Sequence, residues 1–257
     1  MPDNASNSPW LVRYRPDARA GLRLICLPYA GGSAAVFRPW AETLAPVAEV
    51  CAVQLPGRGS RLPEPPLEEL PHIVEALADG LRPYWQRPYA LFGHSMGALI
   101  GFELARRLRR EGAPPPQILF VSGRRAPQTP STDSPTHDLP DPEFIEHLRG
   151  LGGTPAELLA NPELMQLMLP VLRADFAVCQ TYAYRDEPPL EFPISVFGGL
   201  SDSTERDKLE GWRTHTRAGF SLHMLPGDHF FLNSSRQLLL RTIAARLLQT
   251  KSATCAA

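Results

Sequence analysis

The chain alternates short apolar runs with segments whose apolar residues recur at helical spacing. This alternation is typical of a parallel sheet covered by helices, because parallel neighbouring strands need a long crossover connection. The expected strands are Leu22 to Leu27, Val50 to Leu55, Tyr89 to Phe92, Ile118 to Ser122, Ile194 to Phe197 and Ser221 to Leu225. The expected helices are Phe37 to Leu44, Leu70 to Trp85, Met96 to Arg110, Glu205 to Thr216 and Ser235 to Leu248. We therefore predict an α/β fold with a mostly parallel central sheet and helices on both faces.

One interval interrupts this alternation. Between about residues 124 and 190 no strand pattern appears, and helices are expected at Pro142 to Arg149, Pro155 to Leu159 and Glu163 to Tyr184. Connections in α/β units usually span about 2–6 residues, and much longer ones often form lids over a site. We therefore predict a single domain, residues 1–257, with a helical lid insertion at about 124–190. Residues 126–140, rich in Pro, Ser and Thr, are expected to form its hinge.

Composition excludes several classes of protein. The 26 Lys and Arg residues against 27 Asp and Glu leave a formal net charge of −1, so no basic field attracts nucleic acid. No apolar run approaches the roughly 20 residues that cross a bilayer, and the first residues are polar, so we expect a cytoplasmic protein without membrane contact. Cys26, Cys51, Cys179 and Cys255 lack metal-finger spacing, which favours free thiols and no metal site.

The sharpest local motif is Gly-x-Ser-x-Gly centred on Ser95. It directly follows an apolar strand and opens a helix-forming series, which is the setting of a nucleophile elbow. Gly93 and Gly97 would leave space where a Cβ atom would meet neighbouring strands. The helix N-terminus, at Met96, would direct free N–H groups toward a developing oxyanion.

A serine nucleophile needs a base and an acid that orients the base. His229 follows the end of a late strand, where parallel sheets collect site residues, and Asp202 follows the strand before it. Asp207 and Asp228 are rival acids, but the first lies in an expected helix and the second adjoins the histidine. The other histidines lie in expected helices, the hinge, a strand or the elbow: His72, His94, His137, His147, His215 and His223. The order Ser95, Asp202, His229 is that of α/β-hydrolases.

An oxyanion hole needs a second donor, which α/β-hydrolases take from the loop after an early central strand. Here that loop contains Ala30 followed by Gly31 and Gly32, which allow close backbone approach to a substrate. We expect the N–H groups of Ala30 and Met96 to form the hole. A plain turn is the alternative interpretation of this loop.

With these residues assembled, the chain resembles the type II thioesterases that accompany polyketide synthases and nonribosomal peptide synthetases. The resemblance covers nearly everything from residue 22 to residue 248. Its motifs are Pro28-Tyr29-Ala30-Gly31-Gly32, Leu55-Pro56-Gly57-Arg58, Gly93-His94-Ser95-Met96-Gly97, Leu139-Pro140-Asp141, Gly152-Gly153-Thr154-Pro155, Leu169-Pro170 with Arg173-Ala174-Asp175-Phe176, and Gly227-Asp228-His229-Phe230-Phe231-Leu232. The chain departs from many members at Tyr29, which replaces a histidine, and at Gly59, which replaces a charged residue.

The resemblance implies an α/β-hydrolase that cleaves acyl thioesters from the phosphopantetheine arm of acyl or peptidyl carrier proteins. It would edit stalled or misloaded units through a Ser95–His229–Asp202 acyl-enzyme mechanism, with the oxyanion held by Ala30 and Met96. The only prosthetic group would be the phosphopantetheine of the carrier, so the enzyme itself needs no cofactor. We expect a monomer.

Residues that contact the substrate and its carrier can also be suggested. Tyr29 and Phe230 adjoin the oxyanion loop and the catalytic histidine, and Leu167 with Met168 belongs to an apolar stripe that could line an acyl chamber. Carrier proteins are usually acidic, so arginines near the site could attract them. The docking candidates are Arg58, Arg61, Arg124 and Arg125.

Other functions share these residues. A carboxylesterase or lipase, a medium-chain acyl thioesterase of fatty acid synthesis and a cyclising terminal thioesterase would carry the same triad. A non-catalytic binding protein could keep the fold but would lack a triad member, and none is missing here. Hydrolysis rates on different acyl donors would separate these alternatives.

Overall fold

A computed structural model describes residues 8–17, 19–130, 134–154 and 156–255. Within these residues, seven strands form one sheet in the order β1-β3-β2-β4-β5-β6-β7. The strands are β1 (Leu11–Arg13), β2 (Arg23–Leu27), β3 (Glu49–Val53), β4 (Tyr89–His94), β5 (Leu119–Ser122), β6 (Ile194–Gly199) and β7 (Phe220–Leu225). Strand β1 pairs antiparallel with β3 at one edge, and the other neighbours pair in parallel. The predicted α/β class is confirmed.

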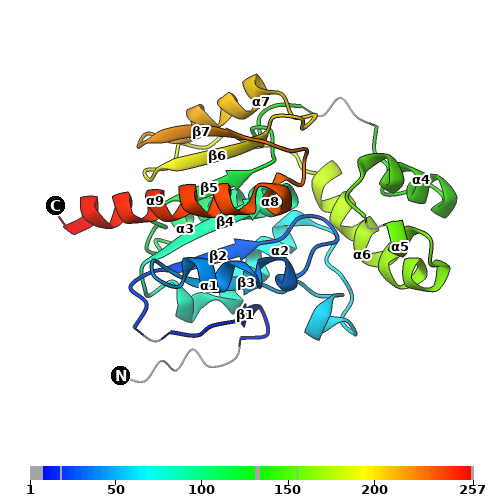
Figure 1. Cartoon of the computed structure of the whole chain (residues 1–257), viewed down its shortest axis with the longest axis horizontal. Coiled ribbons are helices and arrows are strands. Elements are labelled where there is room, and N and C mark those ends of the chain that lie inside the picture. Colours follow the sequence, from blue (N-terminus) through cyan, green and yellow to red (C-terminus); the bar gives the residue numbers. More distant parts are fainter. Residues whose placement is uncertain (1–7, 18, 131–133, 155, 256–257) are drawn as a thin grey trace.

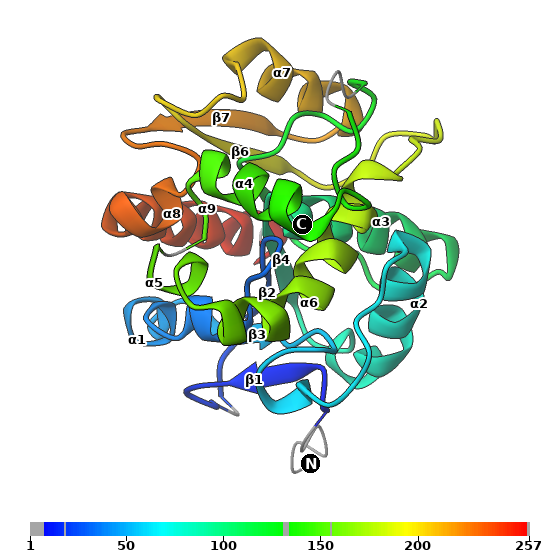
Figure 2. The ribbon, with the colours of Figure 1, turned by 90° about the vertical axis from the view of Figure 1, so that its right-hand side faces the viewer.

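Helices cover both faces of the sheet (Figures 1 and 2). The helical elements outside the insertion are η1 (Ala34–Phe37), α1 (Trp40–Leu44), η2 (Gly59–Arg61), α2 (Leu70–Gly80), η3 (Arg82–Tyr84), α3 (Met96–Arg110), α7 (Arg206–Glu210), η4 (Gly211–His215), α8 (Phe231–Ser234) and α9 (Arg236–Cys255). Alternate residues of β2 enter different cores: Ile25 packs on the side of α2 and α3, and Cys26 on the side of α1 and α9. The strand is buried on both faces, which explains its continuous apolar run.

Some boundaries differ from the sequence expectation. The segment expected as one helix from Leu70 to Trp85 divides into α2 and η3, because Pro83 has no N–H and its ring clashes with the preceding turn. Pro39 separates η1 from α1 in the same way. Strand β1 was not expected, since three residues are too short to show a period.

The insertion lies beyond the carboxyl ends of the parallel strands, between β5 and β6 (Figures 1 and 2). It contains α4 (Asp141–Leu151), α5 (Ala156–Leu159) and α6 (Pro162–Gln180), and it has its own apolar core around Phe144 and Leu169. Helix α6 ends before the expected Tyr184, where the Thr181 hydroxyl donates to the Ala177 carbonyl. Residues 131–133 of the expected hinge, and Pro155, lie outside the described residues. The assignment of the whole chain to one domain stays a prediction.

Two further findings concern membrane-spanning helices and metal sites. Among the described helices, none has the length and apolarity needed to span a membrane. The described residues also contain no group of three His, Cys, Asp or Glu side chains that could hold a metal ion. Among the described residues, Cys26, Cys51 and Cys179 are not joined in disulfides.

The first turn of helix α3 packs with its backbone directly against the backbone at the ends of β2 and β4. A Cβ atom on Gly97 would lie 2.1 Å from the Leu27 carbonyl oxygen, and one on Gly93 would lie 2.1 Å from the Gly97 carbonyl oxygen. Both obstacles are backbone atoms, so no side-chain rotation can relieve them. Glycine at these two positions lets β2, β4 and α3 meet.

We predict that Gly97→Ala destabilises the protein by about 3 kcal/mol or more, because the new methyl group forces the backbone apart. Gly150→Ala is the matched control: it lies in α4, and nothing stands within 4 Å of its added Cβ. This control should be neutral or stabilising by up to about 1 kcal/mol. Denaturant unfolding of the two variants measures both effects, and equal stabilities would contradict the contact.

Candidate active site

Ser95 occupies a strained turn between β4 and α3. Its φ of 52° and ψ of −112° make it, among the described residues, the one non-glycine residue with positive φ. The Ser95 N–H donates to the Ser122 carbonyl at 2.8 Å, which anchors the turn to β5. Strain at an isolated position is typical of functional sites. The half-buried hydroxyl faces the cavity described below.

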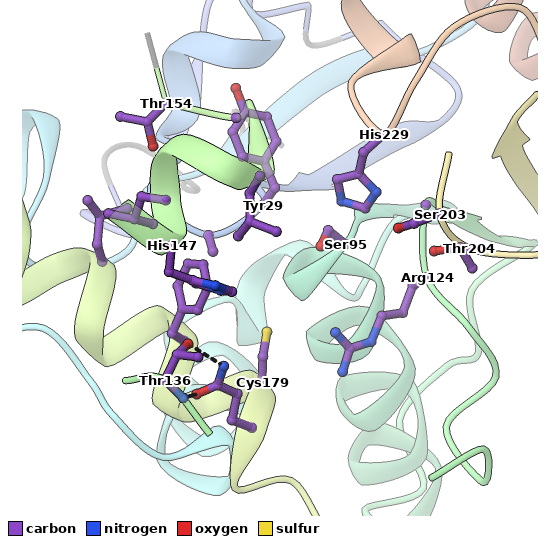
Figure 3. A pocket seen from close by; sticks show the side chains of 18 of the residues that line it. Tyr29, Ser95, Arg124, Thr136, His147, Thr154, Cys179, Ser203, Thr204 and His229 are labelled. Carbon is purple, nitrogen blue, oxygen red and sulfur yellow. Dashed lines mark hydrogen bonds between the residues drawn. The ribbon is translucent and has the colours of Figure 1, made fainter. Parts of the chain in front are cut away.

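His229 lies above Ser95 in the close view (Figure 3). Its Nδ1–H donates to Asp202 Oδ2 at 3.0 Å, and the other oxygen of Asp202 accepts the Thr204 N–H at 3.1 Å. The loops after β6 and β7 approach closely enough for this bond because Gly199 has no side chain: a Cβ there would lie 2.4 Å from the Asp228 carbonyl oxygen. With Nδ1 bound to the carboxylate, Nε2 is the nitrogen left for the serine proton.

The Asp202 carboxyl is held in its ionised form. Burial acts to raise its pKa, but the hydrogen bond and charge of His229, with the Thr204 N–H, outweigh burial and leave the pKa below its ordinary value. Its side chain is fully buried, whereas 32% of the His229 side chain is exposed. A buried carboxylate facing a partly open imidazole can orient that ring and stabilise its protonated form.

The rival acids lie elsewhere. Asp207 is exposed on α7, and Asp228 is exposed with its carboxylate accepting the Phe230 N–H at 2.8 Å. Asp202 is therefore the carboxylate that the structure brings to His229. That the three residues act as a triad stays a prediction that kinetics must test.

The expected oxyanion donors are free to donate to a substrate oxygen. The neighbouring loop amides are engaged, since the Gly31 N–H donates to Asp175 at 2.7 Å and the Gly32 N–H to the Tyr29 carbonyl at 2.9 Å. Within the described residues, the N–H groups of Ala30 and Met96 donate to no protein acceptor. Ala30 lines the cavity with Ser95, and Met96 opens α3.

A cavity of about 700 Å³ lies between the sheet and the insertion (Figure 3). Ser95 and His229 line its side toward the sheet, and Leu148, Leu172 and Phe176 line its side toward the insertion. This volume is in the usual range for small-molecule sites.

Two of the four expected substrate contacts line this cavity. Tyr29 and Phe230 do so, with their rings in an edge-to-face contact at a centroid distance of 5.2 Å. Leu167 and Met168 do not: Leu167 is 52% exposed, and Met168 packs against the core of the insertion. Their assignment was wrong for this cavity, because the stripe of α6 that faces it lies one turn later in the chain.

Sequence reasoning missed several lining residues. The cavity-facing stripe of α6 carries Leu172, Phe176 and Cys179, at spacings of four and three residues that helical periodicity could have identified. His147 also lines the cavity from α4, although the sequence places it only in an expected helix. Which turns of α6 reach the cavity depends on how the helix packs over the sheet, and no local pattern encodes that.

Two of the four proposed docking arginines are buried. Arg58 is 4% exposed and Arg61 8% exposed, each in an ion pair with a nearby carboxylate, so neither can attract a carrier protein. Arg124 and Arg125 instead line the cavity. Their docking role stays a prediction.

His94, beside the nucleophile, is fully buried. Its Nδ1 lies 2.9 Å from Ser122 Oγ, and its ring packs 5.1 Å from that of His229. Burial and the neighbouring His229 lower the pKa of His94 to about 3. His94 is therefore a neutral imidazole that packs against the ring of His229.

Comparison with known proteins identifies the family. A model of the thioesterase domain matches residues 22–247. The chain belongs to the thioesterase family. This thioesterase is a thioester hydrolase, in agreement with the sequence prediction.

The thioesterase is 46% identical over 239 residues to the gramicidin S biosynthesis protein GrsT of Aneurinibacillus migulanus, covering 93% of each chain. It is similar to the solved structure of the type II thioesterase BorB from the borrelidin biosynthetic cluster, with a TM-score of 0.86, 40% identity and coverage of 94% of this chain and 98% of that one. RedJ, from the prodiginine pathway of Streptomyces coelicolor, gives a TM-score of 0.83 at 44% identity, over 89% of this chain and 91% of that one.

We predict that Asp202→Asn lowers kcat by roughly 10³ or more, because an amide no longer holds the required histidine tautomer. Asp207→Asn is the matched control and should leave kcat unchanged, since that side chain is exposed on α7. Steady-state hydrolysis of a short acyl thioester provides the comparison. A greater loss in the control would mean that the acid is misassigned.

The buried His94 should make folding stability sensitive to acid. The unfolded chain binds a proton at this side chain near pH 6.5, but the folded protein binds it only near pH 3, so its contribution is complete above pH 6.5 and is lost as the pH falls toward 3. His94→Gln cannot bind that proton, and its unfolding free energy should fall less steeply across this range. Urea unfolding at several pH values measures both slopes, and parallel slopes would refute the assignment.

Proposed function

We propose that this thioesterase hydrolyses acyl thioesters from the phosphopantetheine arm of acyl or peptidyl carrier proteins. The observation that carries the proposal is the Asp202–His229 pair above the strained Ser95, in a cavity between the sheet and the insertion. The names of relatives add the pathway class, since they belong to gramicidin S, borrelidin and prodiginine biosynthesis. Editing of stalled or misloaded units in such a synthase is the role that this reaction serves.

In the first half-reaction, His229 Nε2 takes the Ser95 hydroxyl proton while the serine oxygen attacks the thioester carbonyl carbon. The negative charge on the carbonyl oxygen is received by the N–H groups of Ala30 and Met96. When the tetrahedral intermediate collapses, the carbon–sulfur bond breaks and the histidine proton passes to the departing pantetheine sulfur. The products are an ester on Ser95 and a free thiol.

In the second half-reaction, water replaces the serine as the nucleophile. His229 takes a proton from water, the hydroxide adds to the ester carbonyl, and the same oxyanion donors act again. Collapse of this intermediate returns the proton to the serine oxygen and releases a carboxylic acid. Asp202 stays ionised throughout and stabilises the positive charge on the imidazole.

The charges that line the cavity favour an acyl donor that carries negative charge. Arg124 and Arg125 line it, and no Asp or Glu is among its described lining residues. A carrier protein brings negative charge on its surface and on the phosphate of its arm, so these arginines would favour its approach. We further propose a cytoplasmic monomer that needs no metal or cofactor of its own.

We predict that purified protein hydrolyses acyl groups from carrier proteins faster than it hydrolyses acyl-CoA or simple esters of the same acyl chain. Release of acid from a matched panel of donors measures the ranking. Ser95→Ala, with its fold verified by circular dichroism, should lower the rate at least 10³-fold on every thioester. A preference for simple esters would favour a carboxylesterase. A preference for medium-chain acyl donors would favour a medium-chain acyl thioesterase of fatty acid synthesis.

A further inference from the structure

Helix α6 of the insertion packs directly on the oxyanion loop, residues 29–32. A Cβ atom on Gly31 would lie 2.7 Å from Leu172 Cδ2, so the Leu172 side chain occupies the space beside this glycine. One turn further along α6, Asp175 reaches the same loop and accepts the Gly31 N–H at 2.7 Å. The loop that carries Ala30 is therefore in contact with two successive turns of the insertion.

Arg58 joins this contact from the loop after β3. Its guanidinium donates to both oxygens of Asp175, at 2.6 Å and 2.8 Å, and also to the Gly32 carbonyl at 3.2 Å. The Asp175 side chain is fully buried, and that of Arg58 is 4% exposed. Two loops of the sheet and one helix of the insertion thus meet at one ion pair.

A buried ion pair of this kind contributes little net stability. Burying two charges costs several kcal/mol per ion, and apolar side chains of similar volume often stabilise a protein as well or better. The gain here is directional, because a bidentate pair defines the distance and orientation of the groups that it joins. Those groups are the helix and the oxyanion loop.

The contact also restricts which amide faces the substrate. Gly31 has a φ of +76°, and its N–H is held by Asp175, so the peptide group before it cannot rotate freely. That peptide group includes the carbonyl of Ala30, whose own N–H is the expected oxyanion donor. The Ala30 N–H lies one peptide group earlier, where the Tyr29 carbonyl accepts the Gly32 N–H at 2.9 Å, so losing the carboxylate would remove one of the two hydrogen bonds that hold this turn and loosen the Ala30 donor.

We propose that Asp175 and Arg58 are positioning residues that make the oxyanion hole depend on the docking of helix α6. A substrate is then activated only while the insertion is seated over the cavity. The inference rests on the proposed function, because it assigns the pair a part in thioester hydrolysis.

The test compares Asp175→Asn and Arg58→Lys with Asp141→Asn. The control removes the ion pair between Arg173 of α6 and Asp141 of α4, which is 2.5 Å long and does not touch the oxyanion loop. Each protein is titrated with a fluorophosphonate to count reactive serines. Its kcat and KM are then measured on a short acyl N-acetylcysteamine thioester, and its affinity for an alkylboronic acid, which forms a tetrahedral adduct with the serine, is determined.

We expect both test variants to lose roughly 10- to 100-fold in kcat per titrated serine. Removal of one oxyanion donor costs about 10²- to 10³-fold, and these variants misplace a donor without removing it, so their loss should be smaller. Their boronic acid affinity should fall by a similar factor, and their KM should change less than threefold. Asp141→Asn should keep the wild-type values. Arg58→Lys keeps the positive charge without the bidentate geometry, so it tests positioning even where Asp175→Asn folds poorly.

Unchanged kcat per titrated serine in both variants would overturn the proposal, as would losses that appear only in the number of titratable serines. The latter result would make the pair a support for folding alone. Failure of the wild-type protein to hydrolyse any thioester would instead overturn the proposed function. The two failures are therefore distinguishable.

Discussion

The site depends on the backbone contact between α3 and β2. Because Gly97 lies against the Leu27 carbonyl, the helix that begins at Met96 starts beside the end of β2 and beside the loop that follows it. This single approach brings the strained serine, the first amide of the helix and the oxyanion loop to one place. A side chain at the contact would separate all three.

The sheet and the insertion contribute different things to this site. The sheet delivers Ser95, Asp202 and His229 from the ends of three parallel strands, where backbone pairing holds their spacing. The insertion closes the cavity and reaches back to the oxyanion loop through Asp175. Specificity can therefore vary at the residues of the insertion that line the cavity, while the hydrogen bonds between strands preserve the spacing of Ser95, Asp202 and His229.

Sequence reasoning was strongest where a residue's position follows from chain order along a parallel sheet. Asp202 and His229 follow consecutive strands, and parallel strands place their carboxyl ends at the same edge, so proximity could be inferred without coordinates. It was weakest within the insertion, where Leu167 and Met168 were assigned to the cavity that Leu172 and Phe176 line. It also treated Arg58 as a surface charge, because nothing local announces a partner 117 residues away.

The sequence by itself determined the α/β class, the strand-turn-helix setting of Ser95 and the order of the expected triad, since these depend on local periodicity and on the geometry of parallel strands. Only the tertiary structure decided which turns of α6 line the cavity and which loop amides remain free. The first depends on how one apolar helix packs over the sheet, and the second on a hydrogen bond between Gly31 and the distant Asp175. Both result from contacts between segments far apart in the chain, which no local pattern specifies.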